Sequence, residues 1–167
     1  MKKLAVTLLG VVLVPLLVVS CGGQNASAPS ASAKAPQPDT PETAAFHYRD
    51  GLMTAIAWKV GKLRGMAQGE ITVDEDAFKK NAHDVAALAG MITEGFIPNS
   101  AVQGSAALPE IWMNFADFQQ KANDLQNAAK TLADAADQGG FEAAKGMVQA
   151  VGQTCGGCHR PYRRRQE

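Results

Sequence analysis

The sequence predicts an all-α protein, an antiparallel up-down-up-down four-helix bundle. Apolar residues recur at helical spacing in four segments between residues 41 and 164, and no segment shows a convincing strand pattern. Start and stop signals separate these segments by turns, so successive helices are expected to be antiparallel neighbours. Residues 42–167 are therefore expected to form one helical domain around a single core.

The first two helices are marked by capping signals. Thr40-Pro41-Glu42 supplies a cap residue, a proline at the first helical position and an acid in the first turn, which predicts a helix to about Gln68. A capping box, residues 72–75, starts a second helix that continues to about Thr93. A connection rich in Gly, Pro, Asn and Ser then spans residues 94–108.

The third helix carries the clearest periodic signal. It begins at Pro109-Glu110 and ends at Gly139-Gly140. Eight apolar residues follow one another at spacings of three and four, as in a heptad seam: Ile111, Phe115, Phe118, Ala122, Leu125, Ala129, Leu132 and Ala136. A coiled-coil dimer would explain this seam, but three companion helices favour packing within the chain. The fourth helix runs from Phe141 to about Arg164.

The N-terminal residues predict export and a lipid anchor. Residues 1–20 combine two lysines with an apolar stretch, as a signal peptide does, and the run before Cys21 resembles a bacterial lipoprotein processing box. Cys21 is therefore the expected lipidation site, and the alternative is ordinary cleavage that leaves a free cysteine. Gly22-Gly23 lacks the aspartate associated with inner-membrane retention, which favours the periplasmic side of the outer membrane.

The linker and the charge balance limit the possible partners. Residues 21–41 are rich in Ala, Ser and Pro and are expected to be a disordered linker of about 25 Å r.m.s. span. Removing residues 1–20 takes two of the 16 basic residues and none of the 16 acidic ones, so the mature chain has a net charge of −2. Nothing in this balance points to nucleic acid.

One motif near the C-terminus indicates a cofactor. Cys155-Gly156-Gly157-Cys158-His159 is the attachment signal of a c-type haem, one haem c per chain, held covalently by both cysteines. On a helix these cysteines and His159 share a face, so the imidazole can bind the iron. A zinc site would need a second ligand pair, and a thioredoxin-like redox pair would need a preceding strand. The haem is expected between the first and fourth helices.

The chain resembles the cytochromes c′ over the whole helical domain. The resemblance is carried by residues 48–53, by Pro109-Glu110-Ile111-Trp112 and by the haem segment 155–163. It implies a penta-coordinate haem that binds nitric oxide and carbon monoxide, a role in nitric oxide tolerance, and a homodimer formed through the first two helices. Enzymatic turnover is not expected, because no acid-base pair or nucleophile accompanies the haem.

The same resemblance assigns residues around the haem. It makes His159 the proximal iron ligand and Arg163 a basic residue beside it. The alternative for Arg163 is a solvated basic tail shared with Arg160, Arg164 and Arg165, and the tail is the expected role of Arg164 and Arg165. Arg49 is expected to meet a haem propionate. Asp50 departs from the neutral polar residue of the family, and an ionised acid cannot donate to a propionate. Phe96 matches an aromatic that packs on the haem, and a plain core role is its alternative.

Met53 decides between two functions. It matches the distal wall, where Leu52, Met53, Ile56 and Phe96 are expected to form an apolar pocket. If Met53 only packs, the iron stays open to small gases; if its sulfur binds the iron, the protein is a low-spin His/Met electron carrier with an unknown redox partner. His47 and His83 are expected to be surface residues. A structural lipoprotein without haem would require the Cys-x-x-Cys-His motif to be accidental.

Overall fold

The computed structural model describes residues 39–165, and these residues form a helical bundle. Its four long helices are α1 (Pro41–Ala67), α2 (Glu75–Ala89), α4 (Phe115–Ala144) and α5 (Val148–Tyr162). Three short helices connect them: η1 (Ile92–Gly95), α3 (Glu110–Met113) and η2 (Lys145–Met147). The predicted all-α class is confirmed. The predicted signal peptide, Cys21 and the linker up to residue 38 lie outside the described residues.

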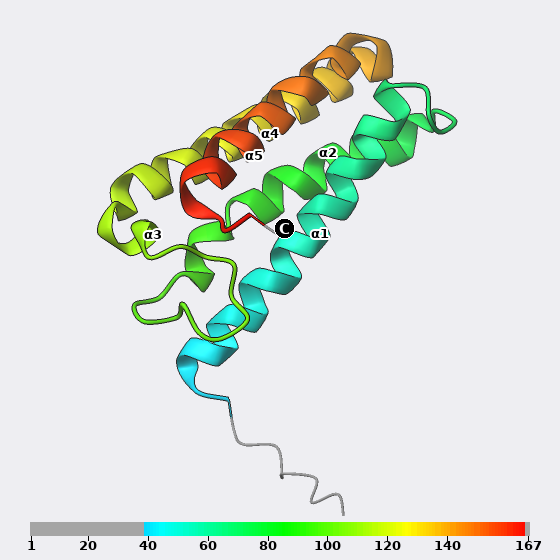
Figure 1. Cartoon of the computed structure of the whole chain (residues 1–167). Coiled ribbons are helices and arrows are strands. Elements are labelled where there is room, and N and C mark those ends of the chain that lie inside the picture. The colour runs from blue at the N-terminus through cyan, green and yellow to red at the C-terminus, as the bar shows by residue number, and fades with distance from the viewer. Residues whose placement is uncertain (1–38, 166–167) are drawn as a thin grey trace, which may run out of the picture. The chain divides into compact units, whose positions relative to one another are not determined.

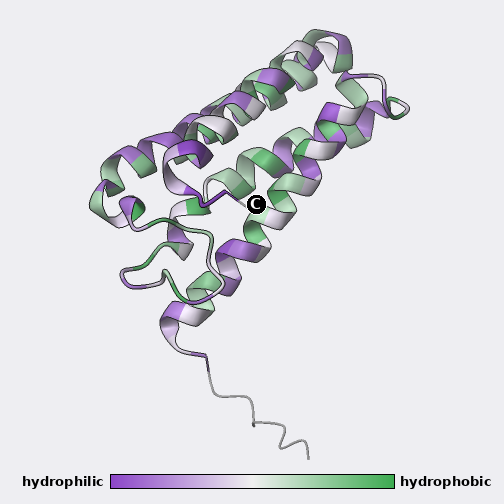
Figure 2. Ribbon diagram, in the orientation of Figure 1, coloured by the Kyte–Doolittle hydropathy of each residue, from purple (hydrophilic) through white to green (hydrophobic). Residues whose placement is uncertain are grey.

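The long helices pack as two antiparallel pairs (Figure 1). α2 packs against α1 and α4, and α5 packs against α4 and α1. Figure 2 shows hydrophobic and hydrophilic residues on each long helix, and hydrophobic residues of all four form the buried core. The largest fully buried side chains come from several of these helices and include Leu63, Phe78, Phe118 and Leu132. No helix in the described part of the chain has the length and apolar character needed to cross a membrane.

The ends of α1 and α2 follow their capping residues. Thr40 caps α1 by accepting a hydrogen bond from the Thr43 amide, and Gln68 ends this helix as predicted. The predicted capping box places the cap of the second helix at its first residue, Thr72. In the structure the cap is Asp74, whose side chain accepts a hydrogen bond from the Ala77 amide at 3.0 Å. This helix also ends earlier than predicted, because the chain turns at Gly90 and continues as the short helix η1.

The predicted third helix is broken at Asn114. Its backbone leaves the helical region there, with φ −125° and ψ 45°, and separates α3 from α4. The break shifts the helical register, so Phe115 is 37% exposed while the other seven residues of the heptad seam are buried. The seam therefore packs within the chain, as expected, from Phe118 onward.

Gly140 produces a second break, which the Gly139-Gly140 pair had predicted. Its φ of +68° is a left-handed conformation that only glycine adopts readily. The helical path resumes at Phe141, whose amide donates to Glu75 Oε2 at 3.0 Å. Glu75 thus caps the start of the last helical segment from the first turn of α2, a contact between residues far apart in the sequence.

We expect Glu75→Ala to destabilise the protein because the Phe141 amide then loses its acceptor. The expected loss in the free energy of unfolding is about 1 kcal/mol, measured by denaturant titration. Asp76→Ala is the matched control, since Asp76 lies in the same turn and makes no such contact. Equal losses in the two variants would contradict the assigned cap.

Candidate functional site

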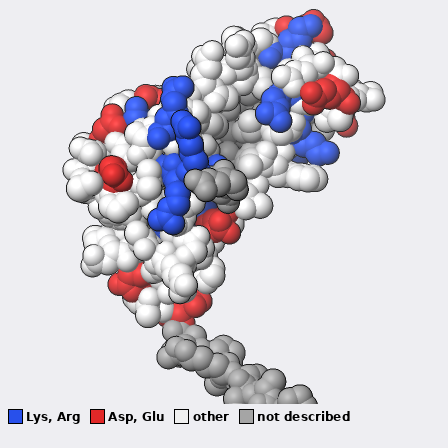
Figure 3. All heavy atoms as spheres, viewed as in Figure 1, with Lys and Arg blue, Asp and Glu red and all other residues white. Residues whose placement is uncertain are grey.

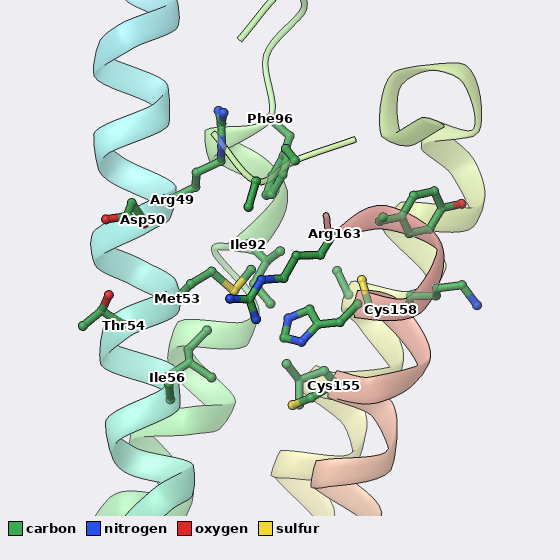
Figure 4. Close-up of a pocket in the computed structure, with 18 of the residues that line it drawn as sticks. Arg49, Asp50, Met53, Thr54, Ile56, Ile92, Phe96, Cys155, Cys158 and Arg163 are labelled. Atoms are coloured by element: carbon green, nitrogen blue, oxygen red, sulfur yellow. The ribbon is translucent and has the colours of Figure 1, made fainter. Parts of the chain in front are cut away.

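A cavity of about 610 Å³ lies beside α5 and is bordered by α1, α4 and the segment 104–107. Its size falls in the usual range of cofactor and ligand pockets, about 300–1,000 Å³. Figure 4 shows side chains of α1 and α5 projecting into it from opposite sides. The fold therefore places a ligand-sized hollow between the first and last long helices.

The three motif residues line this cavity together. Cys155, Cys158 and His159 occupy one face of α5, as their spacing predicts. Both cysteines are free and half-buried, and His159 is reached by solvent through the open side of the cavity. The structure thus brings two thiols and one imidazole to the same wall.

The protonation of these groups follows from burial. Burial raises the pKa of the Cys155 thiol, and it raises the pKa of Cys158 to about 11, so both thiols are protonated at neutral pH. Burial, aided by the nearby Arg163 guanidinium, lowers the pKa of His159. This shift favours the neutral imidazole, which is the state that binds a metal.

The opposite wall is largely apolar. Met53 and Ile56 project from α1, and Phe96 and Ile92 close the wall from the η1 region (Figure 4). Phe96 also packs on Phe118, with ring centroids 4.6 Å apart, so it serves the core as well as the cavity.

The structure corrects one residue of the predicted pocket. Leu52 is buried in the core and does not line the cavity. Successive residues of an α-helix are rotated by about 100°, so Leu52 and its neighbour Met53 face different surroundings. The distal wall is therefore built from Met53, Ile56 and Phe96, without Leu52.

The other two histidines, His47 and His83, lie away from the cavity. His47 is exposed on α1 and does not contribute to the cavity wall. His83 is exposed on α2, where its Nε2 lies 2.9 Å from Asp137 Oδ2. Among the described histidines, only His159 faces the cavity, and Met53 supplies the one soft donor atom on the α1 side.

Arg49 lines the cavity but is held mainly by a loop. Both of its terminal nitrogens donate to the segment that follows α2: Nη1 to Gly95 O (2.9 Å) and Ser100 Oγ (3.0 Å), and Nη2 to Ser100 O and to Ser105 Oγ (2.8 Å). These four bonds use all four N–H groups of the two terminal nitrogens and leave only the Nε–H. The expected propionate contact stays a prediction, and Nε–H is the donor that could make it.

Asp50 and Arg163 occupy opposite sides of the cavity. Both are exposed; Asp50 lies at the outer side of α1 in Figure 4, whereas the Arg163 side chain extends toward the cavity from the end of α5. Arg160, Arg164 and Arg165 are exposed, as expected of a solvated tail. Figure 3 shows Lys and Arg side chains gathered over this end of α5, so the cavity opens beside a positively charged surface.

A polar group behind the motif was not expected from the sequence. Tyr162 is buried, and its hydroxyl donates to Asp117 Oδ2 at 2.6 Å. This bond raises the pKa of Tyr162 to about 12, since the phenolate would face a carboxylate. Lys121 lines the cavity next to it, 3.8 Å from the same carboxylate oxygen. Asp117 and Lys121 lie on the polar side of a heptad pattern, so periodicity gave no signal for them.

The residues fit a covalently bound haem c. The site supplies two thiols on one helical face for the thioethers and a neutral imidazole next to them for the iron. The wall opposite is apolar, as a porphyrin ring requires, and basic groups stand at the rim for its carboxylates. Cys155, Cys158 and His159 would hold the group.

Known proteins resemble this chain over most of its length. Residues 44–163 match the family model described as Cytochrome C′. The cytochrome c′ of Halomonas halodenitrificans is 35% identical over 126 residues, which cover 71% of this chain and 95% of that protein. The cytochrome c prime of Shewanella frigidimarina superimposes with a TM-score of 0.71 at 32% identity, covering 77% of this chain and 100% of that one.

A further solved structure contains a ligand. It is the nitric oxide complex of a variant of cytochrome c prime from Alcaligenes xylosoxidans. The TM-score is 0.67 and the identity 30%, with 75% of this chain and 98% of that chain covered.

Replacing both Cys155 and Cys158 by serine should abolish covalent haem attachment, because no other thiol among residues 39–165 lines the cavity. Each single replacement should leave the haem held through one thioether. Mass spectrometry of the denatured protein and a pyridine haemochrome spectrum measure both results. Cys21→Ser is the control and should keep the added mass of one covalently bound haem; covalent haem in the double variant would contradict the assignment.

Proposed function

Because the chain belongs to the cytochrome c′ family, we propose that its haem c is penta-coordinate and binds nitric oxide and carbon monoxide, in the service of nitric oxide tolerance. The family carries covalently attached haem c, and the family model spans the motif that ends in His159. A relative at 30% identity is known as a nitric oxide complex, which supports the same ligand here. The proposed role is binding and not catalytic turnover.

The observation that carries this proposal is the apolar wall opposite His159. Met53, Ile56, Ile92 and Phe96 offer no hydrogen-bond donor to a molecule in the cavity. Bound dioxygen carries partial charge that a donor would stabilise, whereas nitric oxide and carbon monoxide need none. The wall therefore favours these two gases over dioxygen.

Three polar residues of α1, Arg49, Asp50 and Thr54, lie next to this apolar wall. Asp50 and Thr54 also border the cavity, on the side of α1 that faces away from α5 in Figure 4. The terminal N–H groups of Arg49 are occupied by the loop that follows α2. The donors that remain on α1 stand beside the apolar group of Met53, Ile56, Ile92 and Phe96 and are not part of it.

Met53 also supports a second candidate, the low-spin His/Met electron carrier. Its side chain projects from α1 toward α5, and its sulfur is the one soft donor of the described residues on that side. Ligation by this thioether would close the sixth position and raise the reduction potential. We favour the open site because Met53 belongs to an apolar cluster in which methionine serves as a flexible filler.

Met53→Leu separates the two candidates, since leucine keeps the apolar volume and removes the sulfur. With an open site, the wild type and the variant should both give high-spin spectra, and carbon monoxide or nitric oxide should shift the Soret band of both ferrous proteins. A low-spin wild type that turns high-spin in the variant would show Met53 ligation. Ile56→Leu, a change on the same helix face without sulfur, is the matched control.

We also propose that the protein is anchored on the periplasmic side of the outer membrane through lipidated Cys21. The signal peptide pattern and the processing box support export and lipidation. The linker up to residue 41 is long enough to hold the helical domain away from a membrane surface.

A homodimer formed through the first two helices belongs to the same proposal. Trp58 is 65% exposed on α1, and Lys62 Nζ lies 4.9 Å from its ring centroid. Ile71 and Val73, in the turn before α2, are also exposed. Exposed tryptophan and aliphatic residues near one another are typical of interfaces, so this surface is the expected contact between two copies.

Trp58→Asp should weaken the dimer by at least about tenfold in dissociation constant, since it places a charge in an apolar contact. Analytical ultracentrifugation of the holoprotein measures the change. Met113→Asp is the control, because Met113 is 70% exposed on α3, away from this surface. A monomeric wild type, or equal weakening by both variants, would contradict the assigned interface.

A further inference from the structure

Arg49 is a buried cation whose charge is compensated without a carboxylate. Its side chain is 4% exposed, and it forms no ion pair within the described residues. Its guanidinium carbon lies 5.4 Å from the ring centroid of Phe46 and 5.2 Å from that of Phe96. A buried charge is costly unless polar groups surround it, and here two carbonyl and two hydroxyl oxygens do so.

These four oxygens come from one segment, residues 95–105, which has no regular structure after η1. Asn99 and Gly104 have positive φ angles of 61° and 88°, so the chain turns sharply at both points. The close approach of this segment to α1 also requires Gly95, where an added Cβ would lie 2.8 Å from Arg49 Cβ. The guanidinium therefore acts as the centre around which this loop is folded.

The same loop continues into a backbone pairing with the end of α5. The Leu108 amide donates to Tyr162 O at 3.0 Å, and the Arg164 amide donates to Ala106 O at 2.8 Å. Ala107 and Arg163 form an antiparallel bridge between these two bonds. These contacts with the loop therefore hold the backbone of Arg163, the residue that follows α5.

Ser105 connects the hydrogen bonds of Arg49 to the backbone pairing with the end of α5. Its hydroxyl oxygen accepts from Arg49 Nη2 at 2.8 Å and from the Ala107 amide at 3.1 Å. Ala107 is the residue bridged to Arg163. A continuous set of hydrogen bonds therefore leads from α1, on one wall of the cavity, to Arg163 on the other wall.

We propose that Arg49 is a positioning residue for the His159 side of the cavity. Through Ser105 and the 106–108 segment, Arg49 fixes the backbone of residues 162–164. This backbone sets the position from which the Arg163 side chain extends toward His159. Arg163 lies four residues after His159 and lines the same cavity. The inference rests on the proposed function only in taking His159 as the iron ligand, and it does not depend on which gas binds.

The chemistry of the guanidinium explains why arginine is needed. Its planar fork directs four N–H bonds to fixed points, whereas a lysine ammonium has three donors on a flexible stem. Arg49→Lys keeps the positive charge but cannot satisfy four oxygens at once. Ser105→Ala is the milder change, because it removes the joining hydroxyl and leaves the other three bonds of Arg49 in place.

Amide hydrogen exchange of the holoprotein, followed by NMR, tests the proposal. In both variants we expect the Leu108 and Arg164 amides to exchange about fivefold faster or more, while amides in the centre of α4, such as that of Leu132, stay unchanged. Thr131→Ala is the matched control, since it removes a hydroxyl that donates to a backbone carbonyl on α4. It should leave both reporter amides unchanged.

A second readout is the iron–histidine stretching band of the ferrous protein in resonance Raman spectra. It should shift in Ser105→Ala and not in Thr131→Ala, although neither residue touches His159. Unchanged exchange at both reporter amides, a uniform increase over the whole bundle, or an unshifted band would each overturn the proposal. A failure to bind nitric oxide would refute the proposed function and leave these readouts unaffected.

Discussion

The structure depends on one geometric constraint, the helical spacing that aims Cys155, Cys158 and His159 at a single hollow. These three side chains can hold a haem only if the distance between α1 and α5 leaves room for a flat ring system. The bundle meets this demand by packing α2 against both α1 and α4. Core residues such as Ile56, Phe96 and Phe118 also line the cavity, so the same side chains stabilise the bundle and shape the hollow.

The walls of the cavity are fixed by different means. On the α1 side, helical register alone selects Met53 and Ile56 for the cavity and turns Leu52 into the core. On the α5 side, the last turn of the helix is held by the Tyr162 hydroxyl on Asp117 and by the backbone pairing with residues 106–108. The loop between η1 and α3 belongs to both walls, because Arg49 and Arg163 each contact it.

Local signals predicted the helices and the motif well. Thr40, the apolar stripe of the first helix and the Cys-x-x-Cys-His spacing act over a few residues, so the sequence alone reveals them. The break at Asn114 escaped prediction because the heptad pattern runs across it without interruption. The Glu75 cap of Phe141 and the four bonds of Arg49 join residues far apart in the chain, and their geometry depends on turns at Gly140, Asn99 and Gly104 that no periodicity encodes.

The order of the elements along the chain has its own consequence. The two thiols stand on the last long helix, after every other wall of the cavity has been made. A polypeptide that stops short of residue 155 contains the residues of α1, α2 and α4 but neither thiol, so it cannot hold the haem covalently. Covalent pigmentation therefore marks chains whose synthesis has passed Cys158.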